Sequence, residues 1–73
     1  MSTSTFAVCI KNTGYEASLE LRKIYEVLQD EQARQHGQRR VVDESGEDYL
    51  YPEEFFIDIK LPASLAAYFT AAA

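Results

Sequence analysis

Turn-forming residues interrupt this chain so often that it has no room for a long helix or a long strand. Asn12-Thr13-Gly14, Gly37 and Ser45-Gly46 break its first two thirds, and Pro52 and Pro62 break the remainder. Each of these residue types favours turns for its own steric or hydrogen-bonding reason. Short segments between frequent turns are typical of a small protein built mainly from β-strands.

Apolar side chains alternate or cluster between these turns, which predicts five short strands. In the last of them, Ile57, Ile59 and Leu61 fall on one face of an extended chain. The predicted strands lie within residues 6–11, 23–28, 38–43, 49–51 and 56–61.

Two short helical segments are predicted between the strands. Asp30 is a suitable N-cap, the Glu31 carboxylate suits a first helical turn, and Gly37 can end the helix, which places it near residues 30–36. The sequence that starts at Pro52 predicts a single 3₁₀ turn, because proline is tolerated at a first helical position.

These elements predict one all-β domain over residues 6–61, a small five-stranded barrel or sandwich with a short helical insertion. Residues 1–5 are predicted to be a flexible leader. The Ala-rich residues 62–73 are predicted to be a tail that either frays or forms a helix. In a helix, Leu61, Leu65 and Tyr68 or Phe69 would share one apolar face. Such a helix would dock on the domain or join two copies in a weak homodimer.

Composition narrows the classes of function. Hydrophobic residues make up 47% of the chain and charged residues 26%, which excludes wholesale disorder. A length of 73 residues leaves little room for a core and a deep catalytic cleft together. Cys9 and His36 are the single Cys and the single His, and their predicted places, in a strand and at a helix end, argue against a nucleophilic pair or a metal site. We expect a protein that is not an enzyme and that has no cofactor.

Three absences predict a cytoplasmic location. Cys9 has no second cysteine to pair with, and residues 1–5 are polar and uncharged, unlike a signal peptide. The apolar stretches are much shorter than the roughly 20 residues that span a bilayer, so no association with a membrane is expected.

Part of the chain resembles a known family. The run Asp-Glu-Ser-Gly-Glu-Asp-Tyr-Leu-Tyr-Pro at residues 43–52, together with residues 23–33, is similar to a family of short uncharacterised bacterial proteins. The resemblance covers about residues 6–61 and implies an SH3-like barrel, without implying an activity. Pro52 and Phe55 also match residues that help to line the polyproline groove of SH3 domains. The chain has no Trp to form the wall of that groove, so recognition of polyproline is not implied.

The net charge of −5 is unevenly distributed, because seven carboxylates and no Lys or Arg lie in residues 43–58. The first acids of this run are adjacent pairs, which predicts a solvated hairpin turn with Gly46 at positive φ rather than a Ca²⁺ loop. If Leu50 points inward, alternation places Tyr49 and Tyr51 outside. Exposed aromatic rings with a carboxylate rim are typical of a protein-binding surface.

We therefore predict that this surface binds a basic or amphipathic segment of another protein. The candidate partner-binding residues are Tyr15, Glu47, Asp48, Tyr49, Tyr51, Pro52 and Phe55. One alternative is association with nucleic acid through Arg34, Arg39 and Arg40, which cluster around the predicted helix but belong to an acidic protein. The other is a structural subunit that associates with itself through the tail.

Overall fold

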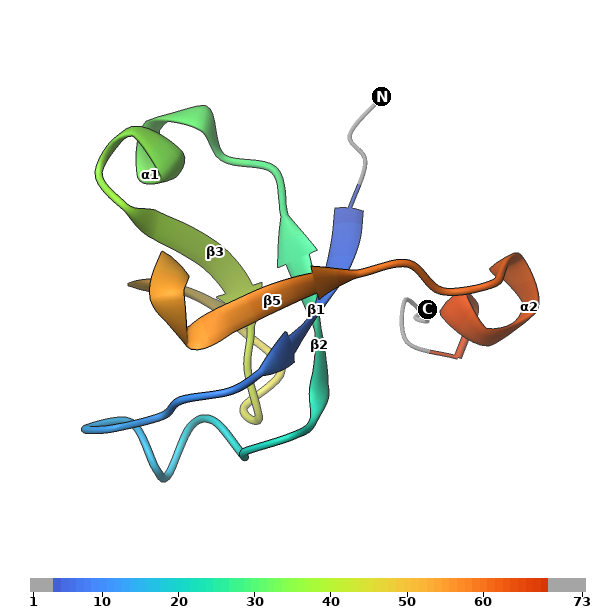
Figure 1. Cartoon of the computed structure of the whole chain (residues 1–73), viewed down its shortest axis with the longest axis horizontal. Helices are drawn as coiled ribbons and strands as arrows, with labels where there is room; N and C mark the ends of the chain where they lie inside the picture. Colours follow the sequence, from blue (N-terminus) through green and yellow to red (C-terminus); the bar gives the residue numbers. More distant parts are fainter. Residues whose placement is uncertain (1–3, 69–73) are drawn as a thin grey trace.

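Five short strands form one antiparallel sheet, which confirms the predicted mainly-β class. In the computed structural model, which describes residues 4–68, the strand order is β4-β3-β2-β1-β5 (Figure 1). β5 returns to pair with β1, so β4 and β5 lie at the two ends of the sheet order. The strands are β1 (Ser4–Cys9), β2 (Ile24–Leu28), β3 (Gln38–Val42), β4 (Asp48–Pro52) and β5 (Phe56–Ile59).

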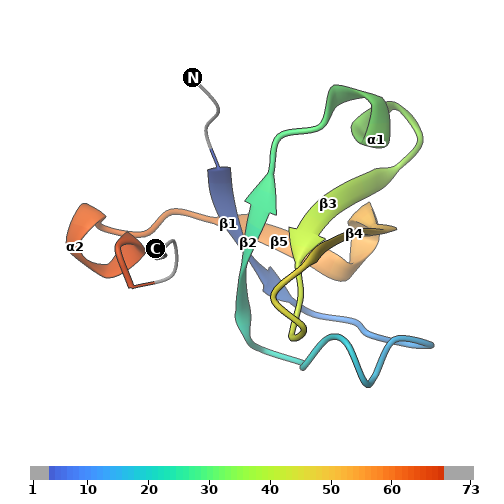
Figure 2. The same cartoon turned by 180° about the vertical axis from the view of Figure 1, so that it is seen from behind.

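Short helical elements connect or follow the strands. They are α1 (Glu31–Gln35), the 3₁₀ turn η1 (Glu53–Phe55) and α2 (Ala63–Ala66). α1 begins as predicted, because the Asp30 carboxylate accepts a hydrogen bond from the Ala33 N–H at 3.0 Å. Gly37 follows α1 with a φ of +71°, a conformation that favours glycine. The view from behind shows that α2 extends beyond β5, well away from α1 (Figure 2).

The ends of the sheet differ slightly from the prediction. β1 begins at Ser4, two residues before the predicted strand, and Ser4 and Thr5 of the predicted leader pair with Leu28 and Val27 of β2. α2 gives the start of the predicted tail a helical conformation. Residues 1–3 and 69–73 lie outside the described part of the chain.

The core lies on one face of the sheet, where small residues of β1 make room for large aromatic side chains. Ala7 and Cys9 are fully buried and lie opposite Tyr25 and Phe56 on the neighbouring strands. A small residue opposite a large one allows dense packing across strands. The remaining members of the core cluster are Leu19, Val27, Val41, Tyr51 and Phe55.

The long loop between β1 and β2 contributes to this core through Leu19, which is only 1% exposed. The Asn12 side-chain amide donates to the Leu19 carbonyl oxygen at 2.8 Å. The Ser18 carbonyl oxygen accepts from the Glu44 N–H at 3.2 Å, which ties the loop to the turn between β3 and β4. The loop is therefore a fixed part of the fold and can hold side chains in place.

β5 carries apolar side chains on both of its faces. Phe56 points into the core, whereas Ile57 lies opposite Val8 on the other face and is 53% exposed. No helix among residues 4–68 is long and apolar enough to cross a membrane.

Candidate interaction groove

A hydrogen bond between Tyr51 and Asp43 forms the floor of a groove beside β4. The Tyr51 hydroxyl donates to Asp43 Oδ2 at 2.5 Å, and both residues are buried. The other carboxylate oxygen of Asp43 accepts from the N–H and the hydroxyl of Ser45, at 2.9 and 2.6 Å. Three donors therefore compensate the removal of this carboxylate from water.

The environment shifts the two pKa values in opposite directions. Burial raises the pKa of Asp43, but the hydrogen bonds from Ser45 and Tyr51 outweigh burial, so the pKa lies below its ordinary value. Burial and the nearby Asp43 carboxylate raise the pKa of Tyr51 to about 12. At neutral pH the pair is a charged carboxylate and a neutral phenol.

Tyr15, from the loop between β1 and β2, forms one wall of the groove. Its ring meets the Tyr51 ring edge-on, with centroids 5.1 Å apart, and also the Phe55 ring, with centroids 5.9 Å apart. Edge-to-face contacts of this kind are favourable and orient the rings. Tyr15 is nevertheless 41% exposed, so part of its ring is available to a ligand.

Tyr49, at the turn end of β4, forms the opposite wall. It is half-exposed, and its hydroxyl donates to Glu47 Oε1 at 3.0 Å. This hydrogen bond raises the pKa of Tyr49 and places a carboxylate at the rim. The open space between the walls has a volume of about 450 Å³. The lining residues are Tyr15, Ser18, Asp43, Ser45, Tyr49, Leu50 and Tyr51.

The carboxylates near the groove differ in whether a cation balances them. Glu44 accepts from Lys23 Nζ and from the Tyr25 hydroxyl, both at 2.6 Å, and these contacts lower its pKa. Asp43 and Glu47 form no ion pair with any Lys or Arg of residues 4–68. The groove therefore presents two negative charges that the described part of the chain does not neutralise.

The predicted orientation of β4 is wrong, although its alternation is right. Tyr51 is buried in the core and Leu50 is 38% exposed, the reverse of the expectation. A tyrosine can occupy a core position here because Asp43 accepts its hydroxyl proton. Tyr49 shares the face of Tyr51 but lies nearer the turn, beyond the cover of the core.

The remaining predicted partner-binding residues do not line the groove. Phe55 is buried beneath Tyr15, and Pro52 is half-buried in a shallow hollow with Gly37 and η1. Asp48 points to the other face of the sheet, where its carboxylate pairs with Arg40 Nη1 at 3.0 Å. Of the predicted partner-binding residues, Tyr15, Tyr49 and Glu47 are therefore the ones that a ligand in the groove can reach.

The three arginines of the nucleic-acid alternative do not form one cluster. Arg39 and Arg40 are neighbours on β3 and therefore point to opposite faces. Arg40 Nε donates to Asp30 at 2.8 Å, and the Ala33 N–H together with Arg40 lowers the pKa of Asp30. Arg39 Nη1 lies 2.9 Å from Asp58 Oδ1. Two of the three arginines are thus engaged by carboxylates of the same chain.

Cys9 and His36 are held in separate local contacts. The buried Cys9 Sγ donates to the Lys11 carbonyl oxygen at 3.3 Å, and burial raises the pKa of this thiol. His36 Nδ1 lies 2.9 Å from the Gln32 carbonyl oxygen on exposed α1. Each side chain is explained by its own structural contacts.

Sequence reasoning missed Asp43 and Ser45 as members of the groove. Their only sequence signal is an Asp two residues before a Ser, the spacing at which a side-chain oxygen can accept from the backbone of a turn.

A comparison of the chain with protein-family models, curated proteins and solved structures finds no match.

Proposed function

We propose that this chain is a non-enzymatic, SH3-like protein-interaction module that binds a basic segment of a partner in the groove between Tyr15 and Tyr49. The observation that carries the proposal is that two accessible tyrosine rings lie beside the carboxylates of Asp43 and Glu47, which form no ion pair within residues 4–68. A cation can lie over a tyrosine face while a neighbouring carboxylate neutralises it.

Two features support the SH3-like description. The first strand pairs with both β2 and β5, so the first and the last strand of the sequence are neighbours in the sheet. A 3₁₀ turn joins β4 to β5, as in the strand–3₁₀–strand segment of SH3 domains. The groove proposed here lies beside Tyr15 and Tyr49, whereas Pro52 lies outside it.

The basic character of the partner follows from the charges along the groove. Glu44 and Asp48 already have cationic partners within the chain, so they contribute less to an approaching ligand. Glu47 lies at the rim beside Tyr49, and Asp43 forms part of the floor. One negative charge in the floor of the groove and one beside its Tyr49 wall favour arginine or lysine over an acidic side chain.

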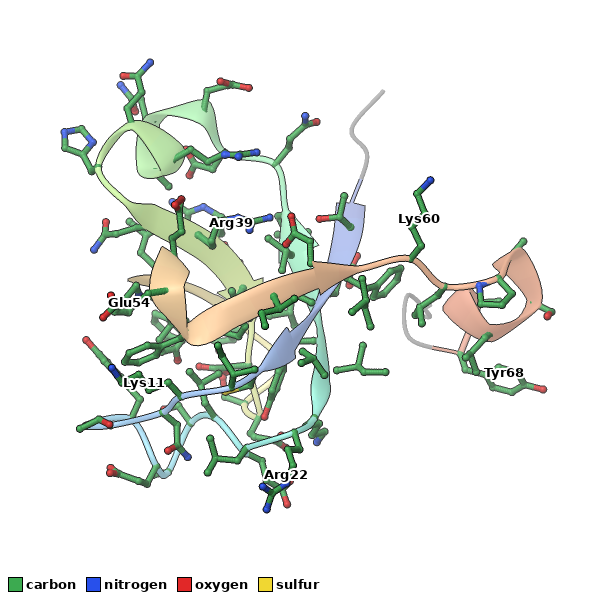
Figure 3. All side chains as sticks on the ribbon, viewed as in Figure 1. Lys11, Arg22, Arg39, Glu54, Lys60 and Tyr68 are labelled. Atoms are coloured by element: carbon green, nitrogen blue, oxygen red, sulfur yellow. The ribbon has the colours of Figure 1, made fainter. Side chains whose placement is uncertain are left out.

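The test is isothermal titration calorimetry of the chain with a short Gly/Arg peptide and, separately, with a Gly/Glu peptide of equal length. We expect saturable binding of the Gly/Arg peptide alone. Tyr49→Ala should weaken this binding by at least about threefold, since it removes a cation–π contact. Tyr68→Ala, which removes an 83% exposed tyrosine far from the groove, should leave it unchanged (Figure 3).

A second pair of variants separates the groove from the overall charge. Glu47→Gln and Glu53→Gln remove the same single charge, but Glu53 lies in η1, outside the groove. We expect Glu47→Gln to weaken binding more than Glu53→Gln. Equal effects of the two variants would show that the peptide responds only to net charge, which would contradict the proposal.

Nucleic-acid association has less support, because Arg39 and Arg40 pair with carboxylates. Self-association through the tail stays a prediction, and α2 and the turn after it expose Leu65 and Tyr68. Sedimentation of the full chain against a chain cut after Pro62 tests this prediction.

A further inference from the structure

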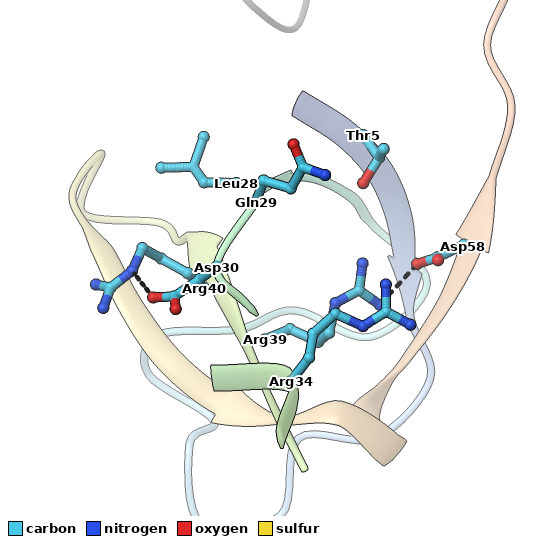
Figure 4. Close-up of a pocket in the computed structure, with 8 residues that line it drawn as sticks. All are labelled: Thr5, Leu28, Gln29, Asp30, Arg34, Arg39, Arg40 and Asp58. Atoms are coloured by element: carbon cyan, nitrogen blue, oxygen red, sulfur yellow. Dashed lines mark hydrogen bonds and ion pairs between the residues drawn. The ribbon is translucent and has the colours of Figure 1, made fainter. Parts of the chain in front are cut away.

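A small cavity of about 90 Å³ lies at the end of the sheet interior nearest α1, away from the groove. Arg34 of α1, Arg39 of β3, Thr5 of β1 and Asp58 of β5 all line it. Figure 4 shows the Arg34 and Arg39 guanidinium groups side by side and directed toward the same wall, where Asp58 meets Arg39. Arg40 and Asp30 also line the cavity, on its opposite side, and pair with each other at 2.8 Å.

The cavity residues occupy positions that alternation assigns to the inner face. Moving two residues along β3, β1 and β5 leads from the core residues Val41, Ala7 and Phe56 to Arg39, Thr5 and Asp58. The interior of the sheet therefore changes from apolar to polar at this end. Arg39 therefore lies on the inner face of the sheet, and its side chain is only 10% exposed.

The charges around the cavity do not balance. Arg39 pairs with Asp58, whose side chain is 56% exposed. Arg34 forms no ion pair with any carboxylate of residues 4–68. Two neighbouring guanidinium groups that share one carboxylate retain one positive charge and unused N–H donors.

We propose that this cavity binds a single phosphate group, either as inorganic phosphate or as the phosphomonoester of a small molecule. Arg34 and Arg39 donate to its oxygens in the forked geometry that guanidinium groups offer to phosphate, and the Thr5 hydroxyl supplies a further donor. In the unliganded protein, the Asp58 carboxylate accepts from Arg39. It therefore competes with a phosphate oxygen for the same donor. This site shares no lining residue with the groove and does not depend on the function proposed for it.

The size of the cavity selects one phosphate group over a nucleic-acid backbone. A volume of about 90 Å³ suits one oxyanion group, because pockets for whole small-molecule ligands have volumes of roughly 300 to 1,000 Å³. The carboxylates Asp30 and Asp58 beside the cavity also disfavour a long polyanion.

The test is a titration of the ¹⁵N-labelled full chain with inorganic phosphate, with O-phosphoserine and with sodium chloride at matched ionic strength. We expect saturable shifts of the Arg39 and Thr5 signals with phosphate and none with chloride. O-phosphoserine separates the two sources of the group, because it binds only if the cavity admits a phosphomonoester.

Three variants sharpen the test. Arg34→Gln changes an exposed side chain and should weaken phosphate binding about tenfold, as expected for a charged hydrogen bond. Arg22→Gln makes the same substitution in the loop between β1 and β2 and should change nothing (Figure 3). Asp58→Asn removes the competing carboxylate and should strengthen binding.

Two results would overturn the proposal. One is a set of shifts that chloride reproduces or that Arg34→Gln and Arg22→Gln affect equally. The other is tighter, Arg34-dependent binding of a single-stranded oligonucleotide, which would assign the arginines to a nucleic-acid surface instead.

Discussion

Replacing Leu19 by Ala is expected to lower the free energy of unfolding by about 3 kcal/mol, although Leu19 lies in a loop. Its side chain is 1% exposed and belongs to the core cluster, so the truncation removes buried apolar surface and leaves a cavity. A domain of this size has a total stability of only roughly 4 to 11 kcal/mol. Urea denaturation followed by tyrosine fluorescence, suitable in a chain without Trp, measures the loss.

Leu21→Ala is the matched control for this prediction. Leu21 lies two residues further along the same loop and is 43% exposed, so the same truncation leaves no cavity in the core. Its effect should be within about 0.5 kcal/mol. If the two variants unfold at the same urea concentration, Leu19 does not anchor the loop to the core.

Tyr51→Phe is expected to cost about 2 kcal/mol of stability. The substitution keeps the buried ring but removes one of the three donors that compensate the buried Asp43 carboxylate. Tyr49→Phe is the matched control on the same strand, since its hydroxyl bonds to Glu47 at an exposed position. We expect the control to change the urea midpoint far less than Tyr51→Phe does.

The pH dependence of this pair gives a second readout. The pKa of Asp43 is lower in the folded protein than in the unfolded chain, where it is about 3.9. Its contribution to stability is therefore complete above about pH 4 and is lost as the pH falls through the folded pKa. The stability gap between the wild type and Tyr51→Phe should narrow below about pH 4. A gap that stays constant down to acid unfolding would contradict a charged Asp43.

Local signals in the sequence were sufficient for the elements of the fold. The Asp30 cap, the positive φ of Gly46 and the 3₁₀ turn after Pro52 depend on short-range sterics and hydrogen bonds, and each occurs as predicted. Alternation also predicted that Tyr49 and Tyr51 share a face. It could not predict which face is the core, because that depends on the position of Asp43 in the folded chain.

The same limit applies to β1 and to the long loop. The side chains of Ala7 and Cys9 are smaller than those of Phe6 and Val8. They nevertheless face the core cluster, because the large side chains of Tyr25 and Phe56 already fill the space opposite them. Leu19 stands in a segment without periodicity, so nothing local marks it as buried. Both features depend on the volumes of residues brought together by the sheet.

The candidate site was predictable in composition but not in geometry. The acidic, tyrosine-containing stretch around residues 43–51 is visible in the sequence, Tyr15 and Tyr49 do line one groove, and Glu47 contacts Tyr49. The separation of Arg39 from Arg40 follows from strand alternation and could have been anticipated. The convergence of Arg34 with Arg39 depends on how α1 packs against β3, and no local pattern encodes it.

The measurement that tests the central claim most directly is amide chemical-shift mapping of the ¹⁵N-labelled chain during titration with the Gly/Arg peptide. The groove between Tyr15 and Tyr49 predicts saturable changes concentrated at Tyr15, Ser18, Ser45 and Tyr49. Changes confined to Leu65 and Tyr68, or the absence of any saturable change, would contradict the assignment of this groove as the interaction surface.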